Sequence, residues 1–169
     1  MIEERTEKEK AFKLKVKKLH KLAKLPSKAY PLEDAGFDIY SVEDVIVQPR
    51  VSREGKNTVP SFAIPPNLDP IEIRTGIAIA VPVGYYTQVS CRSGLGKKGL
   101  RVHPGVIDSG YRAELSILVQ NHGNKPIEIK VGDKVAQLLI LPVPNFIVEE
   151  VAELPVSSRK TSGFGSSGK

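Results

Sequence analysis

The segment Gly105–Arg112 places a carboxylate and a phenol close together in a glycine-bounded turn. Asp108 precedes Tyr111 by three residues, with Gly110 between them. A carboxylate at such a turn can take a proton from water or bind a hydroxyl, and a tyrosine ring can pack against a sugar or a base. The alternative is structural, because Asp often closes a turn by hydrogen bonding to its own backbone.

A second segment, Arg92–Gly99, has the chemistry of a phosphate-binding loop. It combines a guanidinium, a hydroxyl, glycine amides and two lysines, which together can surround a phosphate chain. It lacks the Walker A spacing. The alternative is a solvated connection between two strands.

The C-terminal segment Arg159–Gly168 carries a single aromatic residue, Phe164, among glycines and serines. An aromatic ring on a mobile arm can close over a flat base while Arg159 reaches phosphate oxygens, as a lid does when it excludes water. A plain flexible terminus or residual linker sequence is the alternative.

Short apolar alternations between Gly and Pro turns predict an all-β chain of the sandwich, jelly-roll or barrel type. The expected strands are 37–40, 45–47, 71–73, 77–81, 85–89, 115–119, 127–129 and 135–141. Alternation at Phe12, Leu14 and Val16 also suits a strand, whereas the spacing of Leu19, Leu22 and Leu25 permits a helical turn. A short helix of about one turn is expected after Arg92–Gly96.

The length of 169 residues fits one domain. We expect a charged extension at 1–11, a β domain at 12–156 and a Gly/Ser-rich arm at 157–169. Within the domain, the proline-rich stretch 50–70 is expected to be a surface insertion.

Composition favours a soluble protein of a reducing compartment, with a cytoplasmic location expected and a nuclear or virus-infected-cell context left open. The single Cys91 excludes an internal disulfide framework and reads as a small apolar filler. No apolar run reaches the ~18 residues of a membrane span. The net charge of +6 lies largely in Lys8–Lys28, which has few aromatics for base stacking, so direct nucleic-acid binding is not expected.

Five segments taken in order resemble the motifs of the trimeric deoxyuridine triphosphatases (dUTPases) over roughly residues 12–168. They are 35–41 (AGFDIYS), 92–96 (RSGLG), 105–112 (GVIDSGYR), 132–138 (GDKVAQL) and 159–168 (RKTSGFGSSG). Each motif is of modest specificity, but five in sequence are very specific.

The resemblance implies a jelly-roll or distorted β-barrel fold, assembled as a homotrimer whose active sites each draw on more than one subunit. It also implies hydrolysis of dUTP to dUMP and pyrophosphate, with Mg²⁺ on the triphosphate and the C-terminal arm closing over the nucleotide. This reaction keeps uracil out of DNA and supplies the precursor of dTMP.

The resemblance also assigns residues. Asp108 would activate the attacking water and hold the 3′-hydroxyl, Tyr111 would pack under the deoxyribose, and Asp38 would support Mg²⁺ through its water shell. The remaining roles are in substrate binding: phosphates by Arg92, Ser93, Gly94 and Gln137, their far end by Arg159, Gly165 and Ser166, and uracil by Phe164 and the hairpin backbone at Gly105, Val106 and Ile107.

Several positions depart from the family pattern. Cys91 stands where Pro is common, Lys134 where Arg is usual, and Val102 where many bacterial members have Asn. Deamination of dCTP on the same fold is the nearest alternative, but its catalytic Glu would fall near Leu118, which cannot activate water. A binding module without catalysis is the other alternative, and the presence of Asp108 argues against it.

Overall fold

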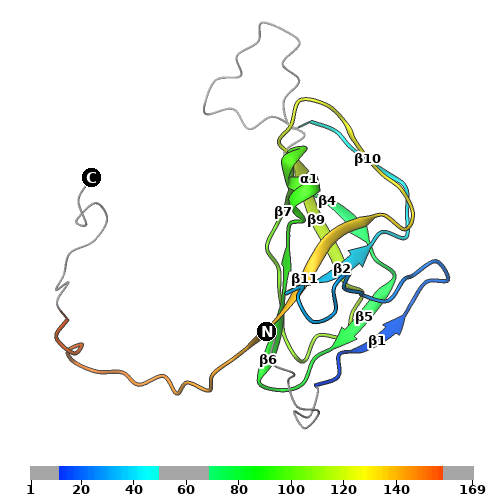
Figure 1. Ribbon diagram of the computed structural model, residues 1–169. Helices are drawn as coiled ribbons and strands as arrows, with labels where there is room; N and C mark the ends of the chain where they lie inside the picture. The colour runs from blue at the N-terminus through cyan, green and yellow to red at the C-terminus, as the bar shows by residue number, and fades with distance from the viewer. Residues whose placement is uncertain (1–11, 50–68, 158–169) are drawn as a thin grey trace, which may run out of the picture.

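The computed structural model describes residues 12–49 and 69–157, which fold into short strands with one short helix among them (Figure 1). The elements are β1 (Lys15–Lys18), β2 (Phe37–Tyr40), β3 (Val45–Val47), β4 (Ile71–Arg74), β5 (Ile77–Ala80), β6 (Tyr85–Ser90), α1 (Ser93–Lys97), β7 (Leu100–Val102), β8 (Val106–Ile107), β9 (Ser116–Asn121), β10 (Ile127–Ile129) and β11 (Lys134–Pro142). The prediction of an all-β fold is therefore confirmed.

The sheet that positions the motifs named above has the strand order β2-β11-β6-β8. All of its pairings are antiparallel. The long strand β11 lies between β2 and β6, and Gln137 pairs with Asp38 on one side and with Ser90 on the other. Three of the five motifs therefore meet across neighbouring strands.

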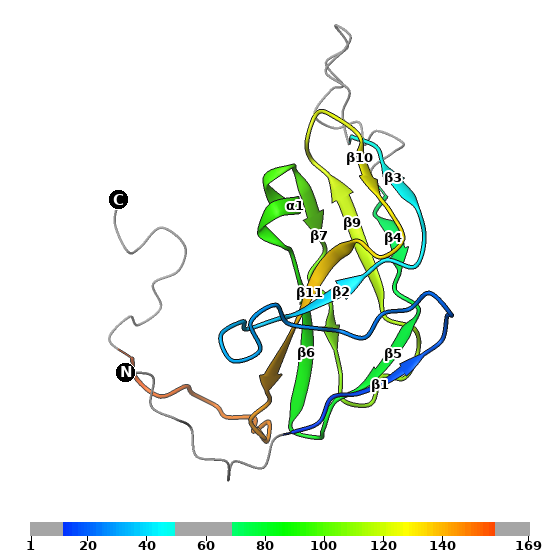
Figure 2. The same cartoon turned by 45° about the vertical axis from the view of Figure 1, so that its right-hand side comes forward.

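A second sheet, of order β4-β9-β7, packs against the first around one apolar core, with the two-stranded ladders β10-β3 and β1-β5 completing the fold (Figure 2). In β9, Ile117 and Val119 are buried while Leu118 between them is exposed, as the period of two requires. The core draws Val89 and Leu138 from the first sheet. In the described residues these ladders remain separate sheets rather than one closed barrel.

The eight expected strands all form; three have the expected bounds, and the ends of the other five differ by at most two residues. The helix after Arg92 is a single short one, as expected. Residues 15–18 form a strand, but no helix follows at Leu19, because the backbone N–H groups of Leu19 and His20 both bond to the carbonyl of Gly76. No helix in the described part of the chain is long and apolar enough to cross a lipid bilayer.

The described chain continues beyond β11 as an extended segment, residues 143–157, that leaves the body of the domain in both views (Figures 1 and 2). It is rich in exposed apolar side chains: Phe146, Ile147, Val148, Leu154 and Val156. Val148 is 97% exposed. The expected extension at 1–11, nearly all of the insertion at 50–70 and the arm from residue 158 lie outside the described residues.

Candidate active site

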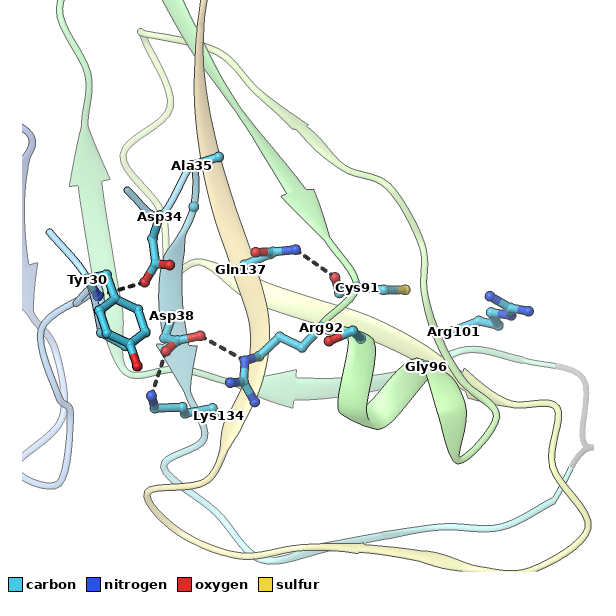
Figure 3. A pocket seen from close by; sticks show the side chains of 13 residues that line it. Tyr30, Asp34, Ala35, Asp38, Cys91, Arg92, Gly96, Arg101, Lys134 and Gln137 are labelled. Atoms are coloured by element: carbon cyan, nitrogen blue, oxygen red, sulfur yellow. Dashed lines mark hydrogen bonds and ion pairs between the residues drawn. The ribbon is translucent and has the colours of Figure 1, made fainter. Parts of the chain in front are cut away.

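A cationic cavity of about 600 Å³ opens where β2, β11, the end of β6 and α1 meet. Its charged lining comes from these elements, from β7 and from the loop before β2, with the cations Arg92, Arg101 and Lys134 and the carboxylates Asp34 and Asp38 (Figure 3). The excess of positive charge over negative suits an anionic ligand. Tyr30 also lines this cavity.

Asp38 ties two of these cations together at the cavity wall. Its Oδ1 lies 2.7 Å from Arg92 Nε, and its Oδ2 lies 2.6 Å from Lys134 Nζ (Figure 3). The hydrogen bond and charge of Asp38 raise the pKa of Lys134, so that ammonium stays protonated. The Asp38 side chain is only 14% exposed, and both of its carboxylate oxygens form ion pairs.

Arg92 is held through Nε alone, because no other hydrogen bond joins its guanidinium to the described residues. Its two terminal amino groups therefore remain available. An arginine fixed on one edge by a carboxylate and open on the other can form paired hydrogen bonds to a phosphate. Ser93 and Gly94, at the start of α1, are exposed beside it.

Gln137 stabilises the backbone just after β6, next to Arg92. Its Nε2 donates to the carbonyl oxygen of Cys91 at 2.9 Å (Figure 3). A Cβ at Gly36 would lie 2.9 Å from Gln137 Oε1, so the glycine of the first motif gives this amide its space. The amide therefore helps to hold the cavity in shape as well as lining it.

Two of the residues that depart from the family pattern, Cys91 and Val102, are in contact. The backbone N–H of Val102 donates to Cys91 Sγ at 3.0 Å. The thiol therefore links the end of β6 to β7, which is more than the expected role of an apolar filler. The third departure, Lys134, pairs with Asp38, while Asp133 accepts the N–H of Lys130 at 2.9 Å within its own turn.

The turn that carries Asp108 follows β8 directly. The carbonyl oxygen of Asp108 accepts the N–H of Tyr111 at 3.1 Å, so backbone atoms close this turn. The Asp108 carboxylate is exposed and has no hydrogen-bond or ion-pair partner among the described residues. The structure therefore does not show the alternative in which the Asp108 side chain closes its own turn.

Asp108 does not share the cationic cavity. It lines a separate hollow of about 550 Å³ with Ser109, the start of β6 and the beginning of the segment 143–157. Ile107 pairs with Thr87, so Asp108 lies at the level of Tyr86, six residues before Arg92 along the same strand. At ~3.3 Å per residue, about 20 Å separates the two positions.

The structure thus brings the predicted residues into two groups. Asp38, Arg92, Ser93 and Gln137 line the cationic cavity, with Gly94 one residue further along α1. Gly105, Val106 and Ile107 lie with Asp108 and Tyr111 along β8 and the turn that follows it. Arg159, Phe164, Gly165 and Ser166 lie outside the described residues.

Sequence reasoning did not assign a role to Arg101, Lys134 or Tyr30, which also line the cavity. The signal at Arg101 was present in the alternation of β7, whose neighbours Leu100 and Val102 are buried. Lys134 lies in the fourth motif, but neither its contact with Asp38 nor the position of Tyr30 could be predicted, because these depend on strand register and on the path of a loop.

The described residues do not supply a protein-held magnesium site. They contain no group of three or more His, Cys, Asp or Glu side chains that could hold a metal ion. Both oxygens of Asp38 already contact cations. Mg²⁺ takes about six oxygen ligands and often binds substrate phosphates, and the cations of this cavity fit phosphates that could carry such a metal.

Comparison with known proteins agrees with the motifs. The family model of the dUTPases matches residues 57–168. The deoxyuridine 5′-triphosphate nucleotidohydrolase of Nautilia profundicola is 41% identical over 162 residues, covering 94% of this chain and 100% of the relative. That of Clostridium tetani is 40% identical over 161 residues, covering 94% and 98%.

Solved structures of dUTPases are similar to this chain as well. The dUTPase of Staphylococcus bacteriophage 80alpha with dUpNHpp has a TM-score of 0.76 and 30% identity, covering 93% of this chain and 99% of that chain. A mutant dUTPase from phage phi11 of S. aureus, described for its coordination of a structural Mg(II) ion, has a TM-score of 0.69 and 26% identity, covering 85% and 99%. Because its fold, its motifs and its close relatives agree, the chain belongs to the dUTPase family.

Proposed function

We propose that this chain hydrolyses dUTP to dUMP and pyrophosphate, using a water molecule activated by Asp108. The observation that carries the proposal is the unpartnered carboxylate of Asp108 in the turn after β8. An exposed carboxylate with no structural partner is free to act as a general base. The names of the relatives, which are deoxyuridine triphosphate nucleotidohydrolases, support the choice of substrate.

The chemical step is an in-line displacement at the α-phosphorus. Asp108 takes one proton from water, the water oxygen bonds to the α-phosphorus, and the bond from that phosphorus to the bridging oxygen breaks. Pyrophosphate then leaves with the electron pair of the broken bond. Positioning and charge stabilisation supply most of the catalysis in such a reaction.

The phosphates are proposed to bind in the cationic cavity. Arg92 would meet them with its free amino groups, next to Ser93 and Gly94, while Asp38 keeps Arg92 and Lys134 in place. Arg159, Gly165, Ser166 and Phe164 of the C-terminal arm are proposed to complete the phosphate and uracil contacts. Magnesium, in this proposal, arrives on the triphosphate and offsets its negative charge.

Assembly as a homotrimer is part of the proposal. One chain holds Asp108 about 20 Å from Arg92, too far for both to act on one triphosphate. A site built from the phosphate cavity of one subunit and the turn of another removes this separation. The exposed apolar segment 143–157 offers surface for contacts between subunits.

Base and sugar selection are proposed to come from β8 and the following turn. Tyr111 would pack under the deoxyribose and exclude a 2′-hydroxyl. The backbone at Gly105, Val106 and Ile107 would read the edge of uracil, since cytosine presents a donor where uracil presents an acceptor. A cytoplasmic location is proposed, where the reaction would limit uracil in DNA and supply the precursor of dTMP.

The test is a substrate panel. Purified full-length protein with Mg²⁺ is incubated separately with dUTP, dCTP, dTTP and UTP, and the products are identified by chromatography. Selective formation of dUMP and pyrophosphate from dUTP is the expected result. Formation of dUTP from dCTP would replace the proposal with deamination, and no turnover of any nucleotide would reject catalysis.

A further inference from the structure

The turn 108–113 has few ties to the rest of the domain. Ile107 pairs with Thr87 before it, and the N–H of Leu115 donates to the carbonyl of Ile77 after it. Between these points, the bonds made by Tyr111 and Arg112 stay within the turn or reach only its end at Glu114. Among the described residues, only the side chain of Glu114 hydrogen-bonds this stretch to the body of the domain.

Glu114 makes this link with both its side chain and its backbone. The carboxylate accepts the N–H of Gly76 at 2.8 Å on Oε1, and Arg74 Nη2 at 3.0 Å on Oε2. The backbone carbonyl of the same residue accepts the hydroxyl of Tyr111 at 2.9 Å. One residue therefore joins the far end of the tyrosine ring to the connection between β4 and β5.

That connection is a firm anchor. Gly76 has φ of +66°, and a Cβ there would lie 2.7 Å from His20 Cβ, so the backbone is closely surrounded. The N–H of Arg74 donates to Glu43 Oε1 at 2.8 Å. The position of Glu114 is thus set by a closely packed and hydrogen-bonded part of the domain.

The charge state of Glu114 suits this role. Partial burial opposes its ionisation, but hydrogen bonds from Arg74 and Gly76, together with the charge of Arg74, lower the pKa of the carboxyl below its ordinary value. The residue is therefore ionised at neutral pH. Its side chain is 22% exposed, which leaves the pair partly shielded from solvent.

We infer that Glu114 is a positioning residue that fixes the Tyr111 ring and the Asp108 turn, and thereby sets the discrimination between deoxyribose and ribose. This inference rests on the proposed hydrolysis of dUTP. A ring held at both its backbone and its hydroxyl leaves a defined gap beneath a sugar. With Glu114 removed, the ring gains freedom, a 2′-hydroxyl is tolerated better, and Asp108 is aimed less well.

The experiment compares full-length Glu114→Ala and Glu114→Gln with a matched control, Glu43→Ala. The control removes a carboxylate that contacts the same connection, through the N–H of Arg74, but does not touch the turn. Values of kcat and KM are measured for dUTP and UTP, with the melting temperature of each variant. Hydrogen exchange of the amides in 108–115 reports the order of the turn independently of activity.

For Glu114→Ala we expect kcat for dUTP to fall by about 100-fold, because small displacements of reacting groups carry costs of that order. The ratio of kcat/KM for dUTP over UTP should fall about tenfold, and exchange in 108–115 should rise. Glu114→Gln, which keeps an acceptor for the N–H of Gly76, should recover part of each loss. Glu43→Ala should change the melting temperature without changing the ratio or the exchange.

An unchanged dUTP/UTP ratio with unchanged exchange in Glu114→Ala would overturn the inference, as would equal effects in Glu43→Ala. If wild-type protein turns over no nucleotide, the proposed function fails. In that case the exchange measurement alone decides whether Glu114 orders the turn, because it needs no substrate.

Discussion

Replacement of Arg92 by Lys tests how the phosphate cavity works. The native side chain uses Nε for Asp38 at 2.7 Å and keeps its two terminal amino groups free. A lysine preserves the charge and can pair with Asp38, but its single ammonium cannot also present a fork to a phosphate. The substitution therefore separates the geometry of the cation from its charge.

The expected magnitude follows from the bonds lost. A hydrogen bond to a charged group contributes about 1.5–3 kcal/mol, and about 1.4 kcal/mol corresponds to a tenfold change in affinity. Arg92→Lys should therefore weaken binding of a non-hydrolysable dUTP analogue by roughly 10- to 150-fold. Stability should fall by less than about 1 kcal/mol, since the ion pair with Asp38 can re-form at a partly exposed site.

Isothermal titration calorimetry with dUpNHpp and Mg²⁺ measures the affinity, and thermal unfolding measures the stability. The matched control is Arg101→Lys, a cation of the same cavity that makes no ion pair within the described residues. It should weaken binding by a much smaller factor. Affinity of Arg92→Lys within threefold of wild type would refute the account of a guanidinium held on one edge and open on the other.

Three further outcomes are expected. Gly36→Ala places a Cβ 2.9 Å from Gln137 Oε1 and 3.2 Å from both Gln137 Cβ and Leu139 Cδ2. It should therefore reduce stability by about 1–3 kcal/mol and weaken dUpNHpp binding, measured by thermal unfolding and calorimetry; unchanged stability would contradict this close packing. Because the folded-state pKa of Glu114 is depressed, its contribution to stability is present above the ordinary value of 4.5 and lost as pH falls through the folded value. Melting temperatures below pH 5 should therefore fall less steeply in Glu114→Gln than in wild type, and equal slopes would argue against this linkage. Deletion of 143–169 should abolish trimers, as measured by light scattering. Deletion of 159–169 should leave trimers intact but remove most turnover. A trimer that survives the longer deletion would exclude segment 143–157 as a subunit contact.

Local pattern was sufficient to predict most of the fold. Strands such as β2 and β9 have alternating apolar residues and turn residues at both ends, so their existence follows from the sequence alone. The spacing of Leu19, Leu22 and Leu25 left a helical turn open, and the sequence could not decide the matter because the interaction that does so comes from Gly76, more than 50 residues away. Pattern in a short window contains no information about such a partner.

The candidate site was predictable in its parts and not in its arrangement. Asp38, Arg92, Gln137 and Asp108 were identified from motif order, and the first three do line one cavity. The ion pair of Lys134 with Asp38 and the anchoring of the Asp108 turn by Glu114 depend on contacts between distant strands. Residues of this kind become visible only when the register and the turns are known.

The free carboxylate of Asp108 is the centre of the account, and Asp108→Asn tests it most directly. The amide has the same shape, and the native side chain has no partner among the described residues, so folding and dUpNHpp binding should be retained. Turnover of dUTP with Mg²⁺ should fall by at least about 100-fold, the usual contribution of a general base. A kcat equal to that of wild type, in a variant that still binds the analogue, would contradict the proposal that this carboxylate activates the attacking water.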